Sequence, residues 1–322
     1  MNSRALLAIT LLPSLSFYVF ATTTAGQQES AGHDSDTKFQ LDISSLKQQA
    51  GNGDAQAQYK LGRSYMTGNG VSKNYEEALN WYKKAAKQGS VDAEFALGYM
   101  FEQGLGTKKD YGQAFLHYSN AAQHGYATAE NNLGSMYERG EGVRKDLHEA
   151  AGWYKKAADH SDPVAQCNLA SLYLLGRGTH QNDRLAASLF QAAAELGYAP
   201  AQQNLAWMYY TGTGVTKNNQ QAAQWVRMAA EEGYASAQLD LGYLYEQGKG
   251  VSLDYTAAYM WYRAAADRGE KRAKTQLTKL STLLTVAQIR QADEAAAKLA
   301  ARVPRSDLGN ALTSVGGLFP RR

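Results

Sequence analysis

The side chains most often used as nucleophiles, bases and metal ligands are few in this sequence. Its six histidines are His33, His117, His124, His148, His160 and His180. His117 and His124 are seven residues apart, a spacing that does not bring two ligands onto one helical turn. Cys167 has no histidine at a fixed spacing, so we expect a packed thiol rather than a nucleophile. Because it is the single cysteine, an intermolecular disulfide is the next alternative.

Two other patterns are typical of reactive sites but have simpler interpretations. Gly-x-Gly loops can cradle a phosphate, yet here they occur six times, lack a following Lys-Ser/Thr and precede an Asn or Asp that can open a helix. The paired acids Glu231 and Glu232 lie at the end of a predicted helix, on a solvated face. We therefore predict no catalytic residue, no cofactor and no metal, and expect the chain not to be an enzyme.

The elements that carry these residues repeat with a fixed period of 36 residues. The period is marked by Leu-Gly or Leu-Ala pairs that begin at Leu61, Leu97, Leu133, Leu169, Leu205 and Leu241. Six copies fill residues 55–270. A fixed period between about 20 and 50 residues is typical of a solenoid.

Each copy predicts two helices joined by the glycine loop. In the first copy the earlier helix covers about Ala55–Met66, with small and apolar residues on one face. An Asx residue opens the second helix in every copy, at Asn74, Asp110, Asp146, Asn182, Asn218 and Asp254. Glu77, Gln113, Glu149 and Gln221 follow three residues later and predict reciprocal capping boxes. A glycine ends five of the six second helices, whereas Ser161 takes its place in the third copy.

The organisation that follows is a repeat domain between two terminal segments. We expect a signal peptide at 1–21, a linker at 22–38, a repeat domain at 39–303 and a flexible basic tail at 304–322. The repeats are 55–90, 91–126, 127–162, 163–198, 199–234 and 235–270. Residues 40–50 align with a lone second helix, and residues 271–303 form a C-terminal cap in which Thr285 and Gln288 predict a capping box.

Composition excludes several classes of protein. A 44% apolar share with a net charge of +3 is not typical of a disordered chain. The excess positive charge resides in the segment from Arg302 to Arg322, so the rest of the chain lacks the basic footprint of a nucleic-acid-binding protein. Beyond residue 20 no apolar run approaches the roughly 20 residues of a spanning helix, so we expect no membrane span in the mature chain.

The N-terminus has the order of a secretory signal. Arg4 precedes an apolar run from Ala5 to Phe20, and cleavage is expected after Ala21 or after Ala25. We therefore expect secretion across an inner membrane and a periplasmic location. An extracellular location, or an anchor formed by an uncleaved N-terminus, is the alternative.

The repeated string resembles the Sel1-like repeat, a relative of the tetratricopeptide repeat. In the first copy it comprises Ala57, Leu61-Gly62, Tyr65, Gly68-x-Gly70-Val71, Ala78, Trp81-Tyr82, Ala85-Ala86 and Gly89. The resemblance implies an all-α fold, a right-handed α-solenoid of six 36-residue helix-turn-helix repeats with capping helices. It also implies a scaffold or adaptor that holds other proteins. A Cys-rich branch has been credited with β-lactam binding or hydrolysis, but this chain lacks its cysteine pairs.

Positions on the first helices that packing does not require predict a binding surface on the concave face. One such position holds Asn132, Asn168 and Asn204, whose amides can bind a peptide backbone or, alternatively, satisfy carbonyls of neighbouring helices. The next holds Tyr99, Trp207 and Tyr243, and a third holds Glu102, Glu138 and Tyr210. Trp207 is the strongest candidate because Trp and Tyr dominate the energetics of interfaces, although burial in the core is the alternative.

These observations predict a non-catalytic scaffold for a protein or peptide partner, acting in envelope signalling, envelope assembly or host interaction. The alternative is a cell-wall or β-lactam hydrolase with a site built from several repeats. A spacer that self-associates through its terminal elements is a third possibility. The sequence leaves the partner and the oligomeric state open.

Overall fold

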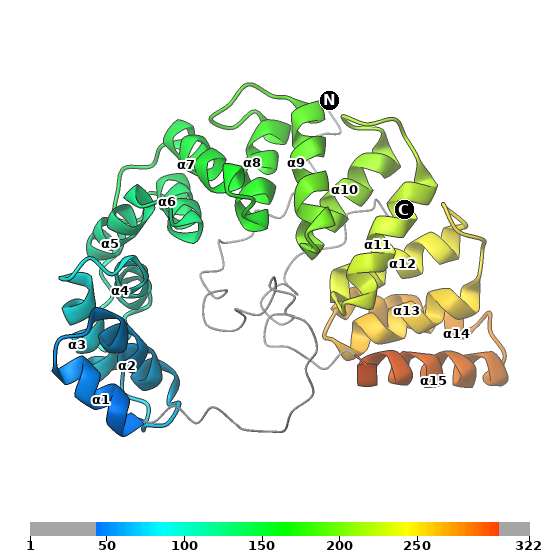
Figure 1. Cartoon of the computed structure of the whole chain (residues 1–322). Coiled ribbons are helices and arrows are strands. Elements are labelled where there is room, and N and C mark those ends of the chain that lie inside the picture. Colours follow the sequence, from blue (N-terminus) through cyan, green and yellow to red (C-terminus); the bar gives the residue numbers. More distant parts are fainter. Residues whose placement is uncertain (1–42, 303–322) are drawn as a thin grey trace, which may run out of the picture. The chain divides into compact units, whose positions relative to one another are not determined.

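The computed structural model describes residues 43–302, and this part of the chain is all-α (Figure 1). The predicted signal peptide, the linker and the basic tail all lie outside the described residues. The chain divides into two compact units, whose described parts are residues 43–160 and 161–302.

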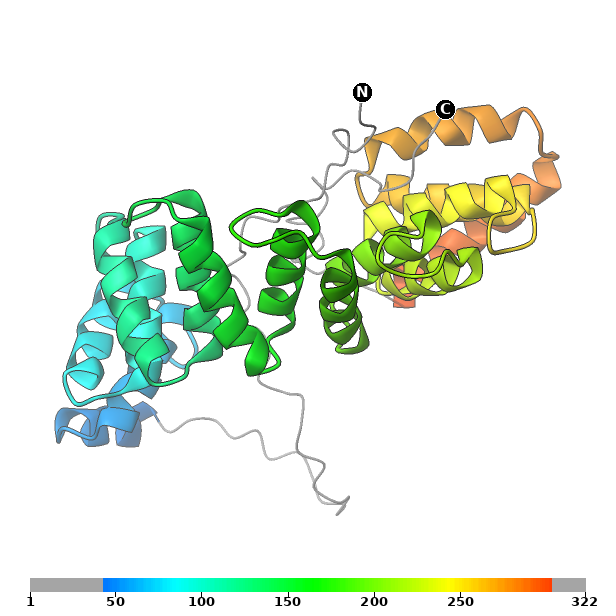
Figure 2. The ribbon, with the colours of Figure 1, turned by 90° about the horizontal axis from the view of Figure 1, so that it is seen from above.

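Fifteen helices make up the described residues, each of the six repeats contributing a first and a second helix. The unit before residue 161 contains α1 (Ile43–Gly51), α2 (Ala55–Thr67), α3 (Tyr75–Ala86), α4 (Val91–Gln103), α5 (Tyr111–Gln123), α6 (Ala127–Arg139) and α7 (Leu147–Asp159). The other unit contains α8 (Pro163–Leu175), α9 (Asp183–Glu195), α10 (Ala199–Thr211), α11 (Asn219–Glu231), α12 (Ala235–Gln247), α13 (Tyr255–Asp267), α14 (Lys271–Ser281) and α15 (Val286–Arg302). Within each unit the helix pairs stack in chain order, so that each second helix packs against the first helix of the next repeat (Figure 2).

The predicted N-caps form in all six repeats. In the first, Asn74 Oδ1 accepts from the backbone N–H of Glu77 at 3.1 Å, and the other five Asx residues accept in the same way. The reciprocal half of the predicted capping boxes, however, is replaced by another bond. The N–H of Asn74 donates to the carbonyl of Tyr65 near the end of the preceding helix at 2.9 Å, and every repeat has the equivalent bond. This bond joins the two helices of a pair end to end and occupies a carbonyl that the helix end leaves open.

The ends of the second helices also follow the sequence. The predicted terminal glycines adopt positive φ, as at Gly89 with φ of 83°. Ser161 takes the same conformation with φ of 61°, the one non-glycine residue with positive φ among the described residues. The third repeat therefore keeps the left-handed cap although a side chain makes this conformation less favourable.

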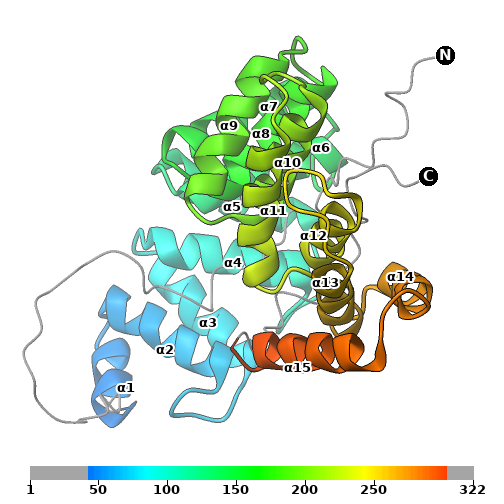
Figure 3. The same ribbon diagram turned by 90° about the vertical axis from the view of Figure 1, so that its right-hand side faces the viewer.

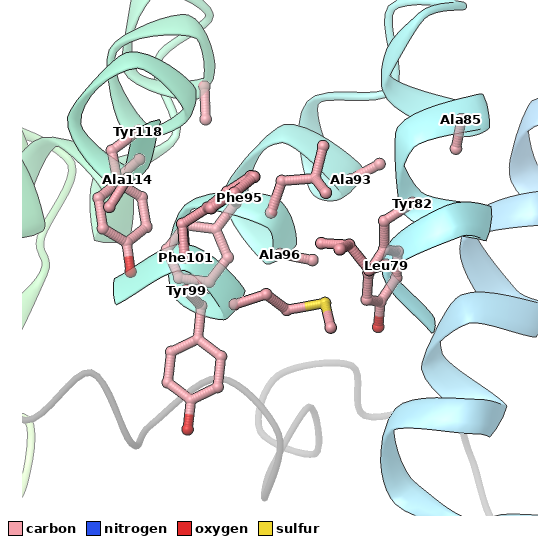
Figure 4. Close-up of a cluster of buried hydrophobic side chains, with 14 of the residues drawn as sticks. Leu79, Tyr82, Ala85, Ala93, Phe95, Ala96, Tyr99, Phe101, Ala114 and Tyr118 are labelled. Atoms are coloured by element: carbon pink, nitrogen blue, oxygen red, sulfur yellow. The ribbon is translucent and has the colours of Figure 1, made fainter. Parts of the chain in front are cut away.

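A tyrosine ring on the second helix packs directly over a glycine on the first helix. A Cβ added to the first-helix glycine would lie 2.5 to 2.7 Å from the ring in the pairs Gly62–Tyr82, Gly98–Tyr118, Gly134–Tyr154 and Gly242–Tyr262. These rings are fully buried, and Figure 4 shows Tyr118 and Tyr82 within the cluster that also holds Phe95 and Leu79. The fourth and fifth repeats have Ala170 and Ala206 instead of glycine, and their second helices carry Phe190 and Val226. In these two repeats the alanine accompanies a second-helix residue that lacks the tyrosine hydroxyl group.

In four of the loops the second glycine forms a contact with the preceding repeat, at Gly106, Gly142, Gly214 and Gly250. A Cβ on Gly106 would collide with the carbonyl of Tyr75, the first residue of the preceding second helix. Gly142 has the same relation to Tyr111, and Gly250 to Asn219. Only glycine permits this close backbone approach, which explains why the Gly-x-Gly loop recurs without phosphate chemistry.

The terminal elements cover the exposed ends of the stacks, as the sequence predicts. Leu46 on α1 is buried against Ala57 and Leu61 of the first repeat. At the other end α13 contacts both α14 and α15, which Figure 3 shows as the last two helices of the described chain. The predicted capping box forms there in both directions, because Thr285 N donates to Gln288 Oε1 at 2.9 Å and Gln288 N donates to Thr285 Oγ1 at 3.3 Å.

Two glycine-to-alanine substitutions test the tyrosine–glycine contact. We expect Gly98→Ala to destabilise the protein by about 1–3 kcal/mol, because the added methyl group overlaps the Tyr118 ring. Gly152 is the matched control, since it lies on an exposed side of α7 and a Cβ added there would have no neighbouring atom within 4 Å. Gly152→Ala should stabilise by up to about 1 kcal/mol through helix propensity. Urea unfolding measures both, and a Gly98→Ala variant as stable as the parent would contradict the contact.

Candidate interaction surface

Residues 43–302 contain no group of three or more His, Cys, Asp or Glu side chains placed to hold a metal ion. His117 instead packs within its unit. Its Nδ1 lies 2.7 Å from Glu94 Oε2, and its ring stacks on Phe101 at a centroid distance of 5.4 Å. This pairing gives a structural role to the residue that replaces tryptophan in the second repeat.

Cys167 is a packed thiol on α8. Its side chain is buried among Ala170, Leu205 and other residues of one hydrophobic cluster. Burial raises the pKa of the Cys167 thiol to about 12, although the Asn204 side chain acts in the opposite direction. A thiol with so high a pKa is almost entirely protonated near neutral pH and is a poor nucleophile.

The asparagines predicted to bind a peptide backbone lie on α6, α8 and α10. Asn132 and Asn204 are buried, whereas Asn168 is partly exposed. Asn204 Nδ2 donates to the carbonyl of Pro200, one turn earlier on its own helix, at 2.9 Å. This bond lies within α10, whereas the alternative for this set was a bond to a carbonyl of a neighbouring helix. The binding role of this set stays a prediction.

The acids predicted to line the surface bond to tyrosines of their own repeats. Tyr118 Oη donates to Glu102 Oε2 at 2.7 Å, and Tyr154 Oη donates to Glu138 Oε2 at 2.9 Å. The sixth repeat has the same bond, from Tyr262 to Glu246 at 2.7 Å. Burial raises the pKa of Tyr118 well above its usual value, and the neighbouring Glu102 adds to this effect. Glu102 and Glu138 therefore hold the buried tyrosine hydroxyls in place, a role that the repeat pattern alone did not predict.

The first, fourth and fifth repeats lack the Tyr–Glu hydrogen bond. The fourth repeat has Phe190 and Leu174 at the two positions, so neither a hydroxyl nor an acceptor is buried. The first repeat keeps Tyr82 but has Met66, and the buried Tyr82 hydroxyl has no hydrogen-bond partner. The fifth repeat has Val226 and Tyr210, and Tyr210 forms its bond elsewhere.

The predicted aromatic residues differ in their exposure. Tyr99 and Trp207 are 7% and 9% exposed, so most of each ring is used in packing. Figure 4 shows Tyr99 pointing away from the other side chains of its cluster. Tyr243 and Tyr210 are partly exposed. A binding role for these four residues stays a prediction, and it is best supported for the two that solvent reaches.

Tyr210 and Tyr243 are brought together by a lysine that the repeat pattern did not single out. Lys249 Nζ bonds Tyr210 Oη at 2.6 Å and lies 5.2 Å from the centroid of the Tyr210 ring and 5.8 Å from that of Tyr243. Lys217 Nζ approaches the Tyr210 ring at 6.0 Å. These four residues are named the Tyr210–Lys249 cluster. The sequence feature that could have indicated this cluster is a lysine in each of two successive glycine loops, Lys217 in the fifth repeat and Lys249 in the sixth.

A row of glutamines that joins successive repeats was also missed. Gln58 Nε2 donates to the carbonyl of Ala50, and Gln238 Nε2 donates to that of Ala230, both at 3.1 Å. Gln202 has the equivalent bond to Ala194 at 3.3 Å. Each glutamine bonds a carbonyl eight residues earlier, at the end of the preceding helix. The available signal was a glutamine in four of the six repeats, at Gln58, Gln166, Gln202 and Gln238, with Glu94 and Glu130 at this position in the other two.

No helix among the described residues is both long and apolar enough to cross a membrane.

Removing one tyrosine hydroxyl tests the Tyr–Glu bond. Tyr118→Phe should destabilise the protein by about 1–3 kcal/mol, because Glu102 loses a hydrogen-bond donor in a buried site. Tyr82→Phe is the matched control and should be neutral or slightly stabilising, since that hydroxyl has no partner. Denaturant unfolding of the two variants gives the comparison. Equal losses of stability would show that the Tyr118 bond contributes nothing specific.

Alkylation kinetics test the state of Cys167. A thiol with a pKa of about 12 should react with iodoacetamide at pH 8 about a thousandfold more slowly in the folded protein than in urea, where the pKa is near 8.5. Mass spectrometry of quenched samples measures both rates. Comparable alkylation rates in the folded protein and in urea would mean that the thiol is accessible and ionised, and would support a nucleophilic role for Cys167.

Comparison with known proteins identifies the repeat. A profile of the Sel1 repeat matches residues 55–90, 91–126, 127–162, 163–198, 199–234 and 235–270. A protective antigen present in uropathogenic Escherichia coli strains, which displays an SLR fold, has 34% sequence identity and a TM-score of 0.73 over 81% of this chain. A Sel1 repeat protein from Oxalobacter formigenes has 33% identity and a TM-score of 0.67, covering 73% of this chain and 68% of that one. No curated protein sequence matches the chain.

The chain spans 56% of the length of the Escherichia coli antigen. The repeat profile covers most of the present chain, and each matched segment holds one first helix, one glycine loop and one second helix. The resemblance and the all-α fold of six 36-residue repeats are thereby confirmed. This chain belongs to the Sel1 repeat family.

Proposed function

We propose that this protein is a non-catalytic scaffold that binds a protein or peptide on the side of the stack formed by the first helices. The observation that carries the proposal is the Tyr210–Lys249 cluster. Its rings pack on the core of the fifth and sixth repeats on one side, while the rings and the lysine side chains remain partly or fully open to solvent. Aromatic and cationic side chains of this kind supply much of the binding energy in protein interfaces.

Two further observations support a scaffold. Sel1 repeats are associated with protein binding in general, and the glycine loops, Asx caps and Tyr–Glu bonds of this chain all have structural roles. The high pKa of Cys167 argues against its use as a nucleophile. These points favour binding over the hydrolase alternative.

For the location, we propose secretion and a periplasmic or surface-exposed mature protein. The basic start, the apolar run to Phe20 and the small residues at Ala21 and Ala25 support a cleaved signal. The similarity to a protein described as a protective antigen is compatible with an exposed location. Envelope signalling, envelope assembly and host interaction are the settings in which we expect the partner to be found.

Site-specific photocrosslinking tests the proposed surface. A benzophenone amino acid replaces Tyr243 on the first-helix side and, as the matched control, Met228, which is 44% exposed on the second helix α11. In intact cells we expect discrete adducts from position 243 and few from position 228, because the partner contacts only the first-helix side. Adducts from position 228 alone would place the partner on the opposite side and refute the proposal.

A further inference from the structure

We propose that the Tyr210–Lys249 cluster is a subsite for a carboxylate side chain, and that the partner presents an extended segment with an Asp or Glu beside an apolar residue. This inference rests on the proposed function, because it assigns a chemical class to the occupant of the first-helix side.

The cluster arises where the fifth repeat departs from the Tyr–Glu pattern. In the second, third and sixth repeats the glutamate accepts a bond from the tyrosine of its own repeat. In the fifth repeat the second helix supplies Val226, which has no hydroxyl group, and Tyr210 stands where the glutamate would be. The Tyr210 hydroxyl instead bonds Lys249 in the loop of the next repeat. The position that bonds a buried tyrosine in those three repeats therefore bonds a loop lysine in the fifth.

Two ammonium groups converge on this place from successive glycine loops. Lys249 lies over both tyrosine rings, and Lys217 approaches the Tyr210 ring from the preceding loop. Within residues 43–302 neither lysine forms an ion pair with a carboxylate, whereas the nearby Lys279 is paired with Glu246 at 2.7 Å. The hydrogen bond with Tyr210 raises the pKa of Lys249, so its positive charge is retained at neutral pH.

A carboxylate is the group that this arrangement fits best. It can accept a hydrogen bond from the Lys249 ammonium group, and such charge-assisted bonds are the stronger class of hydrogen bonds. The adjoining Tyr243 ring, partly exposed, offers an apolar surface to the residue next to the acid. Two lysines are too few for nucleic acid, which is bound through many phosphate contacts.

Peptide titrations of the full chain test this proposal. The probe is acetyl-Gly-Leu-Glu-Glu-Leu-Gly-amide, and the same peptide with Gln for Glu is its uncharged match. We expect the Gln peptide to bind about tenfold more weakly in calorimetry, and Lys249→Met to weaken the Glu peptide by a similar factor. Lys249→Arg should retain most of the affinity. Lys145→Met is the matched control, because Lys145 occupies the loop position of Lys217 in the third repeat and is exposed.

The outcomes separate this inference from the proposed function. Equal affinity for the two peptides, or equal affinity of Lys249→Met and the parent for the Glu peptide, would overturn the carboxylate subsite. Crosslinks from position 243 that persist unchanged in Lys249→Met would also overturn it, yet would leave the binding surface in place. Loss of those crosslinks in Lys249→Met but not in Lys145→Met would support it. Higher ionic strength should weaken binding of the Glu peptide alone, because the added attraction is electrostatic.

Discussion

The structure depends on the close approach of a tyrosine ring on the second helix to a glycine on the first. The ring occupies the space that a Cβ would need, and this contact fixes the distance between the two helices of a pair. The backbone bond from Asn74 to Tyr65 and its five equivalents fixes the ends of the same helices. In the four repeats that have the tyrosine–glycine contact, the two interactions hold both the middle and the ends of the pair, and a second loop glycine such as Gly106 sets how closely the next pair approaches.

Much of this arrangement could be predicted from the sequence because it relies on local backbone requirements. An Asx cap or a terminal glycine is needed wherever a single residue has the backbone conformation of a helix end. The positions of these residues in the repeat are therefore sufficient to place the helix ends. The reciprocal capping boxes were predicted wrongly for a tertiary reason. The N–H of Asn74 is already bonded to the preceding helix, which leaves nothing for Glu77 to accept.

The candidate surface was harder to predict, since the period shows that positions are equivalent without showing which way they point. Glu102 and Glu138 were expected to meet a partner, yet each accepts a bond from the tyrosine sixteen residues later. The sequence did contain a signal for the Tyr–Glu bond. In the fourth repeat both the glutamate and the tyrosine are replaced by apolar residues, Leu174 and Phe190. The same comparison singles out Tyr210, where the pattern is broken without an apolar replacement, and Lys249 becomes visible only once the loops are placed in space.

We propose that the packed helix pairs leave the first-helix side available for a partner. Hydrogen exchange of the full chain, measured with and without the crosslinked partner, tests it most directly. We expect slower exchange in the loops that hold Lys217 and Lys249 and at the adjoining ends of α10 and α12, with exchange in α11 unchanged. Slower exchange confined to α9 and α11 would contradict it.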